Sequence, residues 1–299
     1  MTTYIAPERS DDISRTRPRL FFGVSTGRSG TMAIANALNQ EPGVTCTHEG
    51  KFRHREVPRD RVLRFLTLEN RLAYERPQHA AEIFESTRGD IYVHASKYGG
   101  THFGDIAYNY APFLESISMR YPEARLIVFV RNGIDFVRSA TQAAGEDQTP
   151  VGWPPRGKPL TAVERYVGLG RLAPRRDDPL AARWGLLDHI ARNAWLWAET
   201  NRLILNGVSR REAGTTFIVR YEEFFANPLA SYETLREFLG FAGKMPADVA
   251  AMLRTPINQR ASKVVGVYEV WTESQREAFR ELAGAMMHRL GYALPEPAS

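Results

Sequence analysis

The sequence predicts an α/β protein of three layers, in which helices cover both faces of a central parallel sheet. Short apolar runs without polar alternation are separated by stretches with helical spacing, which is typical of strands buried on both faces. The first of these runs also leads through a turn of glycines and hydroxyl residues directly into a helical pattern. That order of strand, turn and helix is typical of a phosphate-binding loop.

The first half of the chain alternates between the two element types. Strands are expected over 19–25, 44–47, 91–95 ("IYVHA") and 125–130 ("RLIVFV"), the last being the strongest strand signal. Helices are expected over 29–40 ("SGTMAIANALNQ"), in 59–87 as a pair divided near Pro77, and over 110–121. The strands and helices therefore follow one another as a parallel sheet requires.

The second half opens with a helix over 132–143 and continues into an insert at about 144–182 that is rich in Pro, Gly and Arg. Such an insert is either a binding lid or a disordered loop. A long helix over 183–206 and a strand over 215–221 ("TTFIVRY") follow, and the remainder is mainly helical. With no internal repeat or low-complexity linker, we expect a flexible arm at 1–18 and a single domain over 19–299.

Composition limits the classes of function. A formal charge of +5 favours anionic ligands, but the basic residues are dispersed, which argues against nucleic-acid binding. Cys46 is the single cysteine, so an intramolecular disulfide and a cysteine zinc site are excluded. The polar start lacks the apolar core of a secretory signal, and the apolar run 126–130 is too short to cross a membrane. We expect a cytoplasmic protein, of bacterial origin and without a membrane partner.

The turn "GVSTGRSGTM" at 23–32 has the chemistry of an anion site. Backbone N–H groups at a helix N-terminus converge on one point, and the helix dipole adds positive charge there. Gly27 and Gly30 allow positive φ, while Arg28 offers a planar fork to an oxyanion. The alternative is that Ser29 merely caps a helix after a tight turn.

The turn departs from the pattern of ATP-binding loops. G-x-x-x-x-G-K-[ST] requires a lysine and a wider glycine spacing, whereas Gly23 and Gly27 are four residues apart and Arg28 follows. No acidic residue clearly ends a predicted strand to bind Mg²⁺. ATP chemistry is therefore disfavoured, and a small-molecule kinase with an aberrant loop is kept as the main rival among enzymes.

A second candidate anion site is "RLIVFVRNGIDFVRSA" at 125–140. Here a buried strand ends at Arg131, a helix begins at Asn132 or Gly133, and Ser139 lies about two turns further on. Taken singly, Arg131 could cap the strand and Ser139 could be an ordinary surface serine.

Together, "STGRSGT" and "VRNGIDFVRS" resemble the two phosphate-binding signatures of the sulfotransferases that use 3′-phosphoadenosine 5′-phosphosulfate (PAPS). The segment 217–241 is similar to the family's R-Y-E-D-L…N-P…FLG region, and Trp271 with the final "RLGY" is similar to its last helix. The resemblance covers most of residues 20–292 and points to the bacterial small-molecule or carbohydrate type.

The resemblance implies which residues bind the co-substrate. The 5′-phosphosulfate would lie in the loop formed by Arg28, Ser29, Gly30, Thr31 and Met32. The family often has a second threonine where this chain has Met32, so only that side-chain contact is in doubt. Arg131 and Ser139 would hold the 3′-phosphate, and Arg260 or Lys263 would close over the nucleotide. No metal is implied, and no metal-ligand spacing is found.

Sulfuryl transfer needs a base for the acceptor proton, and three candidates remain open. Glu49 in "CTHEGKFRH" best matches the glutamate of carbohydrate and tyrosine sulfotransferases, with His48 beside it to orient it. His94 resembles the histidine of the K-T-H motif in placement, and Lys97 would then help to neutralise the sulfuryl group. Each is alternatively a solvated or structural polar residue.

The acceptor is the least determined part. Aromatic and basic residues in and after the insert would suit an acidic or glycosidic small molecule from secondary metabolism; they are Trp153, Tyr166, Trp184, Trp195, Trp197, Arg156, Lys158, Arg171, Arg175 and Arg176. The aromatics are alternatively core residues and the basic residues a solvated loop. A catalytically inactive PAP-binding protein is the rival from another functional class. The sequence leaves the oligomeric state open, a homodimer included.

Overall fold

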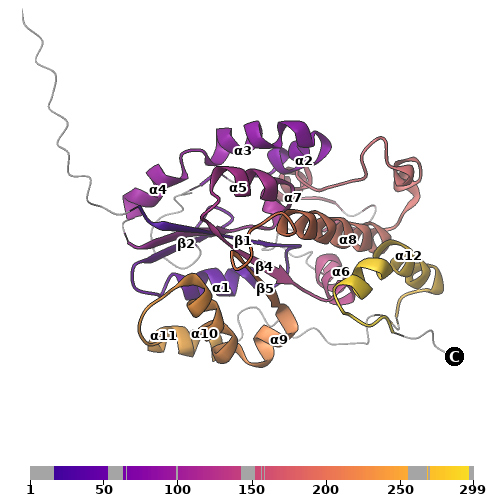
Figure 1. Ribbon diagram of the computed structural model, residues 1–299. Helices are drawn as coiled ribbons and strands as arrows, with labels where there is room; N and C mark the ends of the chain where they lie inside the picture. Colours follow the sequence, from indigo (N-terminus) through magenta and orange to yellow (C-terminus); the bar gives the residue numbers. More distant parts are fainter. Residues whose placement is uncertain are drawn as a thin grey trace, which may run out of the picture.

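The computed structural model describes residues 17–52, 63–64, 66–98, 100–142, 152–155, 157, 159–254, 268 and 270–295. A five-stranded parallel sheet with the strand order β2-β3-β1-β4-β5 lies at the centre of this described part (Figure 1). Its strands are β1 Arg19–Ser25, β2 Val44–His48, β3 His102–Ile106, β4 Arg125–Val130 and β5 Thr216–Arg220. The predicted α/β class with a parallel sheet is confirmed.

Helices cover both faces of the sheet (Figure 1). One face carries α1 Thr31–Leu38, α9 Tyr221–Ala226, α10 Pro228–Leu239 and α11 Ala247–Arg254. The other carries α2 Leu68–Glu75, α3 Ala80–Arg88, α4 Ile91–Tyr98, α5 Leu114–Arg120 and the short 3₁₀ helices η1 Pro77–His79 and η2 Tyr108–Phe113. A third core joins α6 Gly133–Gln142, α8 His189–Val208 and α12 Glu273–Arg289.

The central strand β1 shows why the pattern lacks polar alternation. Leu20, Phe22 and Val24 pack with α3, α5 and η2, whereas Phe21 packs on the opposite face with α1 and α10. Both faces of β1 are therefore buried, and so is every residue from Leu20 to Ser25. A continuous apolar run is what such a strand needs.

The predicted strand 91–95 is wrong, because this segment begins helix α4. Ile91 and Ala95 are buried one helical turn apart, while Val93 between them is 59% exposed. The strand follows as β3, in "HFGDI", where Gly104 and Asp105 interrupt the apolar run. A Cβ at Gly104 would lie 2.1 Å from the Phe21 ring, so the close approach of β3 to β1 needs this glycine.

The insert is partly described. Its described residues include α7 Ala162–Gly168 and η3 Pro179–Ala182, with η4 Trp184–Leu186 shortly after. Leu172 and Leu180 are buried in the third core, so this part of the insert packs against α8. A role as a lid stays a prediction, as does the single-domain assignment, and the expected arm lies outside the described residues except for 17 and 18. No helix in the described ranges combines the length and apolarity that a membrane span requires.

Candidate functional site

The two predicted anion sites lie on neighbouring strands. β1 and β4 pair in parallel, with Ser25 opposite Phe129, so the loops that follow them leave the same edge of the sheet. The chain runs from β1 towards β2 on one side, whereas β4 lies on the other side of β1. Such a reversal of strand order opens a crevice at the carboxyl ends of the strands, where α/β proteins bind ligands.

The loop after β1 has a tightly wound backbone. Gly27, Arg28 and Gly30 have φ values of 82°, 57° and 71°, all in the left-handed region. Inside the turn, the N–H of Gly27 donates to Ser25 Oγ at 2.8 Å, and the Ser29 hydroxyl donates to the Gly27 carbonyl at 3.0 Å. The N-cap of α1 is Gly30, which has no side-chain cap bond, so Ser29 does not cap the helix. The Ser29 hydroxyl therefore does not compete with an anion for the N–H groups in the first turn of α1.

Side chains from both loops meet at this edge. Arg28 Nε donates to Ser139 Oγ at 2.9 Å, and Arg131 Nη1 donates to the backbone carbonyl of Arg28. Arg28 therefore contacts both Arg131 and Ser139, which lie 103 and 111 positions further along the chain. A ligand that bridges the two loops would meet two guanidinium groups and a hydroxyl.

Arg131 is held from two sides. Its guanidinium carbon lies 4.4 Å from the centre of the Tyr221 ring, a cation–π contact, and its carbonyl accepts a hydrogen bond from Trp197 Nε1 at 3.0 Å. Trp197 is fully buried on α8. Trp195 is also buried, so neither tryptophan is available to line an open acceptor site. Asn132 caps α6 through a bond from the N–H of Ile134 to its side-chain oxygen at 2.9 Å.

The turn after β2 carries the predicted base. Glu49 has a φ of 55°, and its N–H donates to the Ile106 carbonyl of β3 at 3.0 Å. Beside it, His48 Nε2 lies 3.0 Å from Thr31 Oγ1 at the start of α1. The turn is thereby joined to the phosphate loop. Among the described residues, Arg28 and Glu49 are the non-glycine residues with positive φ, a conformation that costs about 1–3 kcal/mol and is concentrated at functional sites.

A buried polar network fixes the Glu49 turn. Asp105 Oδ1 accepts from Thr47 Oγ1 at 2.7 Å and from the Gly50 N–H at 2.9 Å, on either side of Glu49. Its other oxygen accepts from the Tyr110 hydroxyl at 2.6 Å, and Tyr110 in turn accepts from Arg88 Nε at 2.8 Å. Asp105 lies next to last in β3, but these donors occupy its oxygens. It is therefore engaged in holding the turn rather than available as a Mg²⁺ ligand.

Other predicted site residues are placed differently. Met32 lies in the first turn of α1, directly after Thr31, and is partly exposed. His94 lies on α4, which precedes β3 instead of following a strand, and Nε2 pairs with Asp90 at 3.3 Å. The assignment of His94 to the carboxyl edge of the sheet was wrong because it required 91–95 to be a strand. Lys97, on the same helix, shares this correction.

Arg260 and Lys263 lie outside the described residues, as do Arg156 and Lys158 of the insert. Within the described ranges, no group of three or more His, Cys, Asp or Glu side chains could hold a metal ion.

Comparison with known proteins decides the family. The family model described as "Sulfotransferase family" matches residues 18–243, which is most of the chain. The chain belongs to the sulfotransferase family. No curated protein matches this sulfotransferase, so the assignment stands on the family model.

Solved structures agree with the fold of this sulfotransferase. It is similar to sulfotransferase STF9 from Mycobacterium avium, with a TM-score of 0.54, 13% identity and coverage of 94% of this chain and 79% of that chain. It is also similar to the sulfotransferase from Alicyclobacillus acidocaldarius, with a TM-score of 0.49, 16% identity and coverage of 93% and 98%. At 13% identity, the likeness to STF9 shows the fold alone.

Sequence reasoning missed several residues of the candidate site. Asp105 lies in β3, and Tyr108 and Tyr110 lie in η2 directly after it. They were missed because the sequence prediction placed this strand too early, at 91–95. Trp197 and Tyr221 support Arg131 from elements distant in sequence. One signal was present: Asp105 is a charged residue within a short, otherwise weakly polar run, and a buried charge needs partners.

Proposed function

We propose that the protein transfers a sulfuryl group from PAPS to a hydroxyl or amine of a small-molecule or glycoside acceptor and releases PAP. The observation that carries this proposal is the 2.9 Å hydrogen bond from Arg28 Nε to Ser139 Oγ. It joins the loop after β1 to the helix after β4, which supports the binding of one doubly phosphorylated adenosine by both. Membership of the sulfotransferase family supports the same activity.

The two loops divide the binding of the nucleotide. The N–H groups of the Ser29–Met32 turn, with the hydroxyl of Thr31 and the guanidinium of Arg28, suit the 5′-phosphosulfate. Arg131 and Ser139 suit the 3′-phosphate, the group that ATP lacks. Because the Tyr221 ring packs on Arg131, the guanidinium is already oriented before a ligand arrives.

In the reaction, the acceptor oxygen forms a bond to sulfur while the bond from sulfur to the 5′-phosphate oxygen breaks. The electron pair of the broken bond stays on the phosphate, where Arg28 and the loop N–H groups stabilise it. Removing one such preorganised donor costs about 2.7–4 kcal/mol of barrier. The acceptor proton goes to the Glu49 carboxylate. The bonds of His48 to Thr31 and of Asp105 to Gly50 hold the turn that carries Glu49 next to the phosphate loop.

PAP is expected to stabilise the protein more than ATP with Mg²⁺. At a concentration of about 100 times Kd, PAP would add about 2.7 kcal/mol to the free energy of unfolding, a rise of several degrees in Tm. Thermal unfolding with each nucleotide measures this. A larger rise with ATP and Mg²⁺ would instead indicate a kinase. Binding of PAP without transfer of labelled sulfate to any acceptor in a broad panel would indicate an inactive PAP-binding protein.

Arg131→Ala is expected to weaken PAP binding by about 10- to 100-fold, because a hydrogen bond to a charged group contributes about 1.5–3 kcal/mol. Adenosine 5′-phosphosulfate lacks the 3′-phosphate, so its affinity should fall by less than about threefold, through the lost bond to the Arg28 carbonyl. Calorimetry with both ligands tests this difference. Equal losses for the two nucleotides would contradict the assignment of Arg131 to the 3′-phosphate.

A further inference from the structure

The orientation of Arg131, the residue assigned above to the 3′-phosphate, depends on the backbone from which its side chain projects. Its Nη1 donates to the Arg28 carbonyl, and its guanidinium packs on the Tyr221 ring. Its Nε is buried and has no hydrogen-bond partner in the described part of the chain. The side-chain contacts alone therefore do not account for the direction of the guanidinium.

The backbone at Arg131 is held by side chains on both sides of one peptide group. The Arg131 carbonyl accepts from Trp197 Nε1 at 3.0 Å, and the N–H of the next residue, Asn132, donates to Glu222 Oε1 at 2.9 Å. Because a peptide group is planar, bonds to its oxygen and to its N–H together limit rotation of the whole plane. They thereby fix the direction in which the Arg131 side chain leaves the end of β4.

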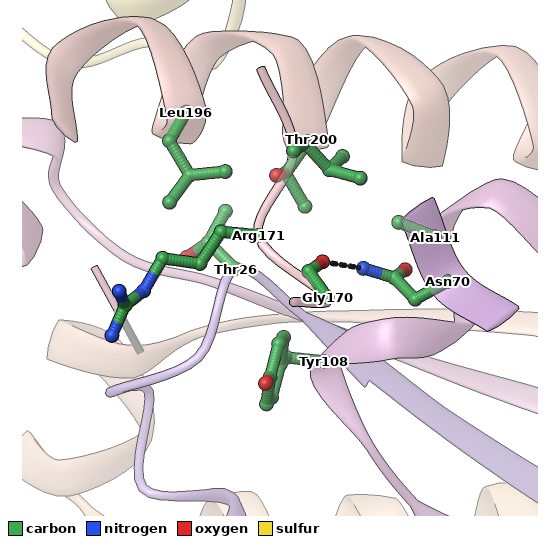
Figure 2. A pocket seen from close by; sticks show the side chains of 9 residues that line it. Thr26, Asn70, Tyr108, Ala111, Gly170, Arg171, Leu196 and Thr200 are labelled. Atoms are coloured by element: carbon green, nitrogen blue, oxygen red, sulfur yellow. Dashed lines mark hydrogen bonds between the residues drawn. The ribbon is translucent and has the colours of Figure 1, made fainter. Parts of the chain in front are cut away.

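The helix that carries Trp197 packs against the phosphate loop. Leu196 and Thr200 of α8 line a small cavity together with Thr26, which directly follows β1 (Figure 2). The cavity volume is about 20 Å³, which is room for one water molecule and too little for part of a ligand. The partner of the Arg131 carbonyl therefore lies on an element that is closely packed beside both loops.

The partner of the Asn132 N–H is held by the C-terminal turn, residues 290–292. Tyr292 donates its hydroxyl hydrogen to the other oxygen of Glu222, Oε2, at 2.9 Å. Burial, and next the hydrogen bond to Glu222, raise the pKa of Tyr292, so the phenol keeps its proton and remains a donor. The Glu222 carboxylate thus accepts from Asn132 with one oxygen and from Tyr292 with the other.

The C-terminal turn is fitted to this position by Arg220 and Gly291. Arg220, at the end of β5, donates from Nη2 to the Leu290 carbonyl, and its guanidinium carbon lies 5.1 Å from the centre of the Tyr292 ring. Gly291 has a φ of 73°, and a Cβ there would lie 2.6 Å from Arg220 Nη2. A glycine is therefore needed between Leu290 and Tyr292.

We propose that Glu222 and Tyr292 are positioning residues for the 3′-phosphate site. Glu222 fixes the peptide group that presents Arg131, and Tyr292 fixes Glu222. This proposal rests on the proposed function. It gives the C-terminal "RLGY" segment a role in nucleotide binding that it performs through Arg131, without touching the nucleotide.

Charge and position act in opposite directions at Glu222. A carboxylate near a phosphate repels it, so the loss of charge alone would tighten PAP binding. Loss of the bond to the Asn132 N–H would instead weaken it, and we expect Glu222→Ala to bind PAP about five- to twentyfold less tightly. Glu222→Gln keeps an acceptor oxygen without the charge, so its PAP affinity should fall by no more than about twofold.

Calorimetry with PAP and with adenosine 5′-phosphosulfate measures these affinities, and thermal unfolding shows that each variant is folded. Adenosine 5′-phosphosulfate lacks the 3′-phosphate, so Glu222→Ala should change its affinity by less than about twofold. Since Glu222 acts through Arg131, the double variant with Arg131→Ala should bind PAP within about twofold of Arg131→Ala alone. Additive losses in the double variant, equal losses for the two nucleotides, or an undiminished PAP affinity in Glu222→Ala would overturn the inference.

Tyr292→Phe carries the test if Glu222→Ala does not fold. It removes the hydroxyl but keeps the ring that packs on Arg220, and PAP binding should weaken about two- to fivefold while adenosine 5′-phosphosulfate binding stays unchanged. Unchanged PAP affinity in this variant would contradict the role of the C-terminal turn.

Two matched controls should keep wild-type affinity for both nucleotides. Glu223→Ala removes the neighbouring carboxylate on α9, whose side chain is 73% exposed. Tyr92→Phe removes another phenol that donates to a glutamate, Glu123, from α4. A wild-type protein that binds no PAP, or binds it no more tightly than adenosine 5′-phosphosulfate, would instead contradict the proposed function.

Discussion

Glu49→Gln is expected to lower kcat by about 10²- to 10⁴-fold, the usual contribution of a positioned general base. The amide keeps the size and hydrogen-bonding reach of the carboxylate but cannot accept the acceptor proton. Its backbone stays held by the N–H bond to the Ile106 carbonyl, and Asp105 still bonds to the neighbouring residues. PAP affinity should therefore stay within about twofold of the wild type.

Single-turnover transfer from labelled PAPS, together with PAP titrations, measures both quantities. His94→Asn is the matched control, because His94 lies on α4 and pairs with Asp90 just before that helix, so the variant should turn over normally. His48→Asn should reduce kcat less than Glu49→Gln, since its bond to Thr31 Oγ1 positions the turn without touching the acceptor. Wild-type turnover by Glu49→Gln would place the base elsewhere.

Asp105→Ala is expected to lower the free energy of unfolding by about 3–5 kcal/mol, because it leaves a buried cation without its carboxylate. Arg88 is 1% exposed and its Nη2 lies 3.9 Å from Asp105 Oδ2. Alanine also removes the acceptor for Thr47 Oγ1, the Gly50 N–H and the Tyr110 hydroxyl. The substitution is therefore expected to lower the stability of the fold and also to loosen the turn that carries Glu49.

Urea unfolding of Asp105→Ala, Asp105→Asn and the wild type tests this. Asparagine retains one acceptor oxygen and should cost less stability than alanine, but should still lower kcat by displacing the Glu49 turn. Glu41→Gln is the matched control, because Glu41 forms another buried pair with Arg236 Nε at 2.9 Å, before β2 and away from the site. It should lose stability and keep its turnover. A loss below about 1 kcal/mol in Asp105→Ala would show that the network is not structural.

The parts of the fold that sequence predicted well are the continuous apolar strands. Residues 19–25 and 125–130 coincide with β1 and β4, because a strand buried on both faces has an unmistakable composition. The strand prediction for residues 91–95 failed because a short apolar run with a β-branched residue fits a helix equally well. The true strand β3 was hidden by Gly104 and Asp105, which are needed for close packing and for the buried network.

The site divides in the same way. Arg28, Arg131 and Ser139 were found because the loops that carry them have recognisable local patterns, and the structure brings them into contact. Trp197 and Tyr221 support Arg131 through contacts between segments far apart in sequence, which no local pattern encodes. Spacing predicts the loops, whereas the partners that orient them depend on the assembled sheet.

The bond between Arg28 and Ser139 has a consequence for how tightly a nucleotide can be held. Nε of Arg28 is the donor in this bond and the Ser139 oxygen is the acceptor, so the hydroxyl hydrogen of Ser139 can still donate to a phosphate oxygen. A nucleotide bound as proposed above would then add contacts to this bond without replacing it.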